Sequence, residues 1–204
     1  MGKVISAMSI SVDGYVGAAD PEQWWPVHER LHGWVFGLAA WRSRQNMEGG
    51  AHTVSSDLVA EEFAGTGAYV LGRNMFDYGQ EPWGEKPPFQ APVFVPTHRP
   101  REPLTRIGTT FTFVTEGIEA ALKLAREAAG DKNVFVSGGA SIVQQCIRAG
   151  LLDELHLHQT PVLLGAGIRL WDDIGTDWKD LQPTRVTAAD GVTHLYYGFD
   201  NTQK

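Results

Sequence analysis

The sequence predicts a single α/β domain with a mostly parallel central sheet, helices on both faces and an antiparallel C-terminal edge. Short β-rich runs alternate with helical segments through the middle of the chain, which is typical of a parallel sheet. Glycine directly follows two of these runs, as it does where a strand turns into a helix. The last two runs have no predicted helix between them, which favours an antiparallel edge.

The elements follow from periodicity and from turn residues. Strands are predicted at residues 4–12, 68–71, 92–96, 111–115, 133–137, 155–161 and 193–199. Helices are predicted at residues 24–47, 57–63, 118–129 and 140–149, with a further helix start directly after Gly72. Seven prolines between residues 79 and 103 exclude long regular elements there, so this region is expected to be a surface loop with one brief strand.

Composition narrows the classes of function. The chain has 204 residues, 43% of them hydrophobic, which suits one domain with a sizeable core, residues 1–204. Its net charge of −7 disfavours binding to nucleic acid or to acidic membrane surfaces. The single cysteine, Cys146, excludes an intramolecular disulfide. No apolar run reaches membrane length and no signal peptide is evident, so we expect a cytoplasmic protein.

Two segments deliver a glycine from a strand into a helix start. The first glycine turn is residues 70–75 (VLGRNM) and the second is residues 135–141 (FVSGGAS). Free backbone N–H groups at such a turn bind anions, and glycine lets a pyrophosphate approach the backbone. Two turns in one sheet therefore suggest a dinucleotide. Neither turn matches the G-x-G-x-x-G or P-loop pattern, and glycine is also common at ordinary strand–helix junctions.

Basic residues follow two of the predicted strands. Arg73 lies in the first glycine turn, and Thr97, His98 and Arg99 follow the strand at residues 92–96. Ligands of open α/β sheets gather at the carboxyl ends of strands, and arginine grips phosphate with two hydrogen bonds. These residues are thus candidates for the 2′-phosphate of NADP, and the alternative is that they are solvated surface charges.

A third motif points to different chemistry. His28, Glu29 and His32 form H-E-x-x-H on a predicted helix, the spacing by which two imidazoles bind zinc beside a general base. A third ligand at the usual spacing is missing, so we expect no metal.

On the strand at residues 155–161, His156 and His158 share one face, as a metal pair or as the polar wall of a pocket. Trp24 and Trp25 are placed to stack on a flat substrate.

Five segments appear in a fixed order along nearly the whole chain. They are residues 11–17 (SVDGYVG), 70–76 (VLGRNMF), 93–99 (VFVPTHR), 134–141 (VFVSGGAS) and 150–157 (GLLDELHL) with 161–167 (PVLLGAG). Together they resemble the dihydrofolate-reductase-like superfamily, and most closely the stand-alone reductases related to the riboflavin-biosynthesis reductase domain. The resemblance implies a three-layer dihydrofolate-reductase-like fold, NADPH as the cofactor and a homodimer. Residues 41–67 have no place in a minimal folate reductase.

The resemblance also assigns site residues. Cofactor contacts are expected at Ala7, Val16, Gly17, Gly72, Arg73, Asn74, Met75, Thr97, His98, Arg99, Gly138, Gly139, Ala140, Ser141 and Ile142. Substrate contacts are expected at Asp13, Trp24 and Trp25. The acid of folate reductases has its nearest counterpart in Glu29, with His28 as a rival, and His158 stands where those enzymes carry a threonine.

Three hypotheses on function follow. The first is an NADPH-dependent reductase of a small, planar heterocyclic or imine or carbonyl substrate, with Glu29, His28 or His158 as the proton donor. The second is a catalytically silent module that binds NADP(H) or another small molecule. The third is a zinc hydrolase built on His28, Glu29 and His32.

Overall fold

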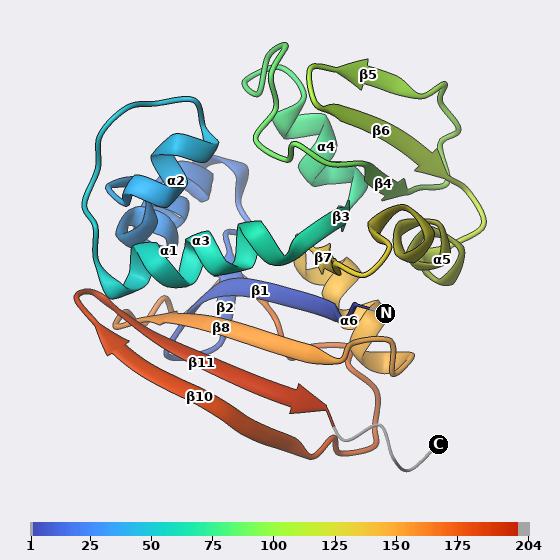
Figure 1. The fold of residues 1–204 in the computed structure, drawn as a ribbon. Helices are drawn as coiled ribbons and strands as arrows, with labels where there is room; N and C mark the ends of the chain where they lie inside the picture. Colours follow the sequence, from blue (N-terminus) through green and yellow to red (C-terminus); the bar gives the residue numbers. More distant parts are fainter. Residues whose placement is uncertain (1, 200–204) are drawn as a thin grey trace.

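The computed structural model describes residues 2–199 (Figure 1). Its strands are β1 (Val4–Ser11), β2 (Tyr15–Gly17), β3 (Thr66–Val70), β4 (Val93–Pro96), β5 (Leu104–Arg106), β6 (Thr109–Val114), β7 (Asn133–Val136), β8 (Glu154–Thr160), β9 (Ile168–Arg169), β10 (Leu181–Ala189) and β11 (Val192–Phe199). Its helices are α1 (Trp24–Phe36), α2 (Ala39–Arg44), α3 (Val54–Gly65), α4 (Arg73–Gly79), α5 (Ile118–Ala129) and α6 (Ala140–Arg148), with a 3₁₀ turn η1 (Pro21–Gln23).

One sheet of nine strands runs through the molecule in the order β10-β11-β8-β1-β7-β3-β4-β6-β5. The six strands from β8 to β6 are parallel, while β10 and β11 form an antiparallel edge and β5 pairs antiparallel with β6. The predicted α/β class, with a mostly parallel sheet and an antiparallel C-terminal edge, is therefore confirmed. Within residues 2–199, no helix is both long and apolar enough to cross a membrane.

Helices cover both faces of this sheet, which makes three layers (Figure 1). On one face α5 and α6 bury their apolar sides against the even-numbered residues of β1, such as Val4 and Met8. On the other face α4 packs through Phe76 against Leu71, and α1, α2 and α3 pack together around Val35 and Val59. Burial of these apolar side chains is the dominant stabilising contribution.

The helix predicted over residues 24–47 is in fact two helices, α1 and α2. Gly37 ends α1 and Leu38 takes an extended conformation with φ −77° and ψ 139°. Leu38 is only 6% exposed and packs with Val35 and Val59, so the break turns the chain and buries this side chain against α3. Periodicity alone does not reveal such a break, because both helices keep the same apolar spacing.

Several strands escape the sequence prediction. The edge strand β10 has mostly exposed residues, and it alternates too weakly to be recognised. Strands β2, β5 and β9 have only two or three residues each. Helix α3 is also longer than the predicted residues 57–63, since Thr53 caps its first turn by accepting a hydrogen bond from the Ser56 amide.

Candidate active site

The two glycine turns meet at the carboxyl ends of neighbouring parallel strands. β3 delivers Gly72 and β7 delivers Gly138, and the Gly72 amide donates to the Gly138 carbonyl at 2.7 Å. A Cβ added at Gly72 would lie 3.1 Å from Ile142 and 3.3 Å from the Gly138 oxygen. Gly138 has a φ of +103°, which side chains rarely adopt. The backbone conformation thus favours glycine at residue 138, and close packing favours it at residue 72.

Arg73 and Arg99 converge on one carboxylate beside the first glycine turn. Arg73 Nε and Arg99 Nη2 each donate to Asp77, both at 2.7 Å. Arg73 Nη1 also reaches Thr97 Oγ1 at 3.5 Å. Burial alone would raise the pKa of Asp77, but the hydrogen bonds from the two arginines lower it below its usual value. Asp77 therefore holds the two guanidinium groups next to each other, and the sequence analysis did not identify Asp77.

The remaining cofactor candidates lie at the same edge of the sheet. Asn74 and Met75 are in the first turn of α4, and His98 follows β4. Gly139, Ala140, Ser141 and Ile142 surround the start of α6. No side chain would clash with a Cβ at Gly139, so the space beside this residue is open. These positions adjoin the two glycine turns, because β7, β3 and β4 are consecutive in the sheet.

The residues expected beside the nicotinamide lie on β1 and β2. Ala7 is in the middle of β1, and Val16 and Gly17 are on β2, which pairs with β9. Asp13 is in the loop between β1 and β2. Its carboxylate accepts hydrogen bonds from Ser11 Oγ at 2.6 Å and from the Leu164 and Gly165 amides at 3.1 and 2.7 Å, which lower its pKa to about 2. In this structure Asp13 ties two loops together, and its contact with substrate stays a prediction.

A row of histidines crosses the sheet beneath α1 and α3. In the strand register, His158 on β8 is opposite Ser9 on β1 and His194 on β11. His156, two residues earlier, pairs with Tyr196. His156 and His158 are each 5% exposed and His194 is fully buried. The shared face predicted for His156 and His158 is thus a buried polar surface and lies under the helices.

Glu62 of α3 reaches into this row. Its Oε1 atom lies 2.8 Å from His156 Nδ1 and 3.6 Å from His158 Nε2. Burial alone would raise the pKa of Glu62, but the two imidazoles lower it to about 2. Glu62 is therefore an ionised carboxylate inside the protein at neutral pH.

His194 connects the row to α3 at its other end. Its Nδ1 atom is 2.8 Å from His158 Nδ1, and its Nε2 atom is 2.9 Å from Ser55 Oγ. Burial, with a smaller contribution from His158, lowers the pKa of His194 to about 4, so this ring is neutral at pH 7. Trp34 of α1 covers the pair, with its ring 4.9 Å from that of His158.

Aromatic rings also follow one another along α1. The centroids of Trp24 and His28 are 4.8 Å apart, and those of His28 and His32 are 4.3 Å apart. Trp24 and Trp25 are 46% and 55% exposed. Burial lowers the pKa of His32 to about 4 and lowers that of His28 as well. Both imidazoles are therefore uncharged at neutral pH, and the two tryptophans are the exposed rings of this stack.

The zinc hypothesis gains no third ligand from the fold. His32 Nδ1 lies 3.2 Å from the His28 carbonyl, and the two rings are stacked on each other. Across residues 2–199, no three His, Cys, Asp or Glu side chains are arranged to hold a metal ion. Glu29 of the same motif points to solvent as an exposed residue of α1.

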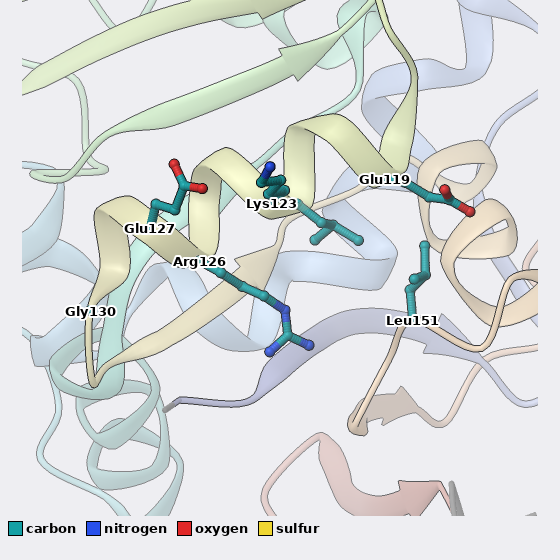
Figure 2. Close-up of a pocket in the computed structure, with 7 residues that line it drawn as sticks. Glu119, Lys123, Arg126, Glu127, Gly130 and Leu151 are labelled. Carbon is teal, nitrogen blue, oxygen red and sulfur yellow. The ribbon is translucent and has the colours of Figure 1, made fainter. Parts of the chain in front are cut away.

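A hollow of about 490 Å³ lies away from all of these residues (Figure 2). Charged side chains of α5 line it, together with Gly130 and Leu151. Because α5 covers the opposite face of the sheet from α1 and α3, this hollow is separated from the histidines. A smaller hollow of about 400 Å³ includes Asp13, Tyr15 and Arg169.

The lowered histidine pKa values predict acid sensitivity. The free energy of unfolding is expected to fall as the pH is lowered from about 6.5 to about 4, because the unfolded chain then binds protons that folded His32 and His194 do not. Each histidine adds at most about 1.4 kcal/mol per pH unit. Urea unfolding over this range should show a smaller slope in His32→Phe. The exposed His52→Phe serves as control, and an equal slope in wild type and His32→Phe would contradict the assignment.

Comparison with known proteins decides the family. Residues 2–195 match the model of the RibD C-terminal domain. The chain belongs to the RibD C-terminal domain family. In Bacillus subtilis (strain 168), protein YyaP is 27% identical over 135 residues, which is 63% of this chain and 71% of YyaP. YwjB is 31% identical over 68 residues, which is 33% of this chain but only 38% of YwjB.

Solved structures agree with the fold of this RibD C-terminal domain protein. A candidate riboflavin biosynthesis protein of Shewanella sp. PV-4 has a TM-score of 0.67 at 17% identity, with 98% of this chain and 99% of that one covered. Dihydrofolate reductase of Enterococcus faecalis, complexed with NADP(H), has a TM-score of 0.55 at 14% identity, with 98% of both covered. RibD of Acinetobacter baumannii has a TM-score of 0.60 at 14% identity, and the match spans 98% of this chain and 59% of RibD.

The superfamily predicted from the sequence is therefore confirmed, and so is the dihydrofolate-reductase-like fold. Family and fold together make the chain a reductase-like protein. Glu62, His194 and Asp77 are the buried or partly buried polar residues that the sequence analysis missed. The only signal for His194 was its place in the last predicted strand, and nothing near Glu62 distinguished it from the other acidic residues of α3.

Proposed function

We propose that this protein is an NADPH-dependent reductase that transfers hydride to a small, planar heterocyclic or imine or carbonyl substrate. The observation that carries the proposal is the meeting of Gly72 and Gly138 at one sheet edge, beside the paired guanidinium groups of Arg73 and Arg99. The Enterococcus faecalis dihydrofolate reductase with the same fold is a complex with NADP(H), which supports this choice of cofactor.

The residues present suit a dinucleotide phosphate. The glycine turns leave backbone N–H groups without side chains in front of them, and the arginines supply two planar donors for a 2′-phosphate. NADPH, when bound, supplies the hydride. Residues at the ends of β3, β4 and β7 would hold the phosphates, and Ala7, Val16 and Gly17 would lie beside the nicotinamide.

The substrate half of the proposal depends on the rings of α1. Trp24, Trp25 and His28 form an aromatic cluster near β2, and an exposed indole face of this cluster can stack on an uncharged planar ring. Reduction of a C=N or C=O group also needs a proton. Glu29, His28 and His158 remain the candidate donors. Both ring nitrogens of His158 already face partners in the row, so it would release a proton from Nε2 only by giving up its contact with Glu62.

Parallel titrations with NADPH and NADH test the cofactor. We expect NADPH to bind in the micromolar range and to raise the melting temperature, because a ligand that binds only the folded state stabilises it. NADH is expected to bind much more weakly, because it lacks the 2′-phosphate. Energy transfer from tryptophan to the nicotinamide and the thermal shift give two independent readouts.

Binding of neither nucleotide would reject the reductase proposal. Tight binding of NADPH without its oxidation by a broad panel of heterocyclic, imine and carbonyl acceptors would favour a catalytically silent binding module. The homodimer expected from the resemblance also remains a proposal, and light scattering of the purified protein measures it.

A further inference from the structure

Seven polar side chains form a continuous row beneath α1 and α3, here called the histidine–carboxylate row. Its members, in order of contact, are Lys3, Glu154, His156, Glu62, His158, His194 and Ser55. The outer end is at the surface, where the Lys3 side chain is 60% exposed and that of Glu154 is 20% exposed. The inner end is buried under Trp34. The row thus leads from solvent at Lys3 and Glu154 to the buried pair His158 and His194.

His156 is held between two carboxylates. Its Nδ1 faces Glu62 Oε1 at 2.8 Å and its Nε2 faces Glu154 Oε2 at 3.2 Å. Burial alone would raise the pKa of Glu154, but Lys3 and His156 lower it, so both carboxylates are ionised at neutral pH. An ionised carboxylate only accepts hydrogen bonds. Each ring nitrogen of His156 that carries a proton therefore has a carboxylate to donate to.

The inner half of the row has two proton arrangements. Only one of the facing Nδ1 atoms of His158 and His194 can donate in their contact. If His194 donates, its Nε2 accepts from Ser55, and His158 Nε2 carries the proton that faces Glu62. If His158 donates, His194 Nε2 carries the proton that faces Ser55. Both arrangements use the same heavy-atom positions, so protons can shift without movement of the chain.

Other charged and titratable groups packed against Glu62 do not interrupt the row. Burial and the Glu62 carboxylate raise the pKa of Tyr196, which keeps its hydroxyl protonated. Glu61, the next residue of α3, turns to the surface and pairs with Arg185 of β10 at 3.0 Å. His32 of α1 lies on the other side of His158 and is neutral at pH 7.

We infer that the histidine–carboxylate row is a proton relay that supplies His158 from the surface, with Glu62 as its central positioning residue. The transfer starts from a His156 ring that carries its proton on Nδ1 alone: solvent gives a proton to Glu154, which passes it to the unprotonated Nε2 of His156. His156 then releases its other proton from Nδ1 to Glu62 Oε1, and Glu62 hands it to His158 Nε2, which is unprotonated in the arrangement where His158 Nδ1 donates to His194. Each step breaks one N–H or O–H bond and forms another, and no oxidant or reductant is involved.

The role of the relay in catalysis rests on the proposed function, because only a reductase would consume the protons that the relay delivers. In the reduction, the substrate carbon takes the hydride, NADP⁺ is formed, and the substrate nitrogen or oxygen takes one proton. Each turnover therefore consumes one proton inside a site that α1 and α3 cover. The relay would replace that proton at His158 from the Glu154 end.

Solvent exchange of the imidazole protons tests the relay in the full chain without cofactor. ¹⁵N-labelled wild type, Glu62→Gln, Glu154→Gln and Glu61→Gln are compared by long-range ¹H–¹⁵N spectra of the histidine rings. The exchange of the His158 ring proton with water should slow by at least about tenfold in Glu62→Gln and in Glu154→Gln, because glutamine does not pass protons on. Glu61→Gln should match wild type.

The direction of the change separates a relay from a structural cluster. Loosening of the fold opens the interior and speeds exchange, whereas interruption of a relay slows it. Exchange at His158 that is unchanged or faster in both variants would overturn the inference. If Glu62→Gln folds poorly, the Glu154→Gln variant still tests the relay, because Glu154 lies at the partly exposed end of the row and its substitution disturbs the interior less. NADPH titration of the same samples shows separately whether the proposed function fails.

Discussion

The variant Glu62→Ala is expected to lose about 3–5 kcal/mol of unfolding free energy at pH 7. Its carboxylate lies 2.8 Å from His156 Nδ1 and 3.6 Å from His158 Nε2, and its side chain is only 11% exposed. Removing the Glu62 carboxylate leaves the buried imidazoles of His156 and His158 without the negative charge that accepts their N–H protons. Urea unfolding of the variant beside wild type measures the loss.

Glu61→Ala is the matched control for this substitution. It removes the same side chain from the neighbouring position of α3, where Glu61 is 69% exposed and pairs with Arg185 at the surface. Such exposed pairs contribute about 0–1 kcal/mol. If both variants lost the same free energy, the stabilising role of Glu62 would come from the helix and not from the buried ion pairs.

The contribution of Glu62 should also depend on pH in a defined direction. Its pKa in the folded protein is about 2 against an ordinary value of 4.5, so the ionised form stabilises the fold fully above about pH 4.5. As the pH falls from there towards 2, the unfolded chain binds a proton at this carboxylate that the folded protein does not, and this stability is lost. The shift corresponds to about 3 kcal/mol. The difference between wild type and Glu62→Ala should therefore shrink below pH 4.5, and a constant difference would contradict it.

The sheet edge where the two glycine turns meet could be predicted from the sequence because its signals are local. A glycine directly after a strand and a basic residue beside it are visible within a few positions, as at Gly72-Arg73 and Gly138. The structure then brings these separate turns together, because β3 and β7 are adjacent and parallel. The sequence does not show that β3 and β7 are neighbours in the sheet. The site could still be predicted without that pairing, because ligands of open α/β sheets gather at the carboxyl ends of the strands.

The histidine–carboxylate row could be predicted only in part. The alternation of His156 and His158 on one strand is local and was recognised. Glu62 and His194 join them from α3 and β11, at separations of 94 and 36 residues along the chain. Contacts of that length depend on sheet order and on the packing of α3, which a single sequence does not specify. The exact end of α1 was missed for a similar reason, since burial of Leu38 and not helix propensity determines it.

Arg73→Ala is expected to weaken NADPH binding by about 10- to 100-fold and NADH binding much less, because a hydrogen bond to a charged group is worth about 1.5–3 kcal/mol. In the structure the Arg73 guanidinium donates to Asp77 at 2.7 Å and is oriented beside Arg99 without any nucleotide. A 2′-phosphate would therefore find the donors already in place, which lowers the entropic cost of binding. Calorimetric titration with both nucleotides measures the ratio.

Arg101→Ala separates a specific phosphate contact from a general loss of positive charge. Arg101 lies 5.2 Å from the Phe76 ring and 5.3 Å from the Phe113 ring, the same rings that Arg73 covers at 6.0 and 5.5 Å, but it donates to Gln80 and not to Asp77. Its removal should change the affinity for NADPH and for NADH by similar, small factors. Equal losses for both nucleotides in Arg73→Ala would instead place Arg73 at the pyrophosphate or in the fold, and the choice of NADPH over NADH would then need another residue. Arg99 shares Asp77 with Arg73, so the effects of removing the two arginines are coupled. The double variant Arg73→Ala/Arg99→Ala should therefore lose less NADPH affinity than the product of the two single fold-losses.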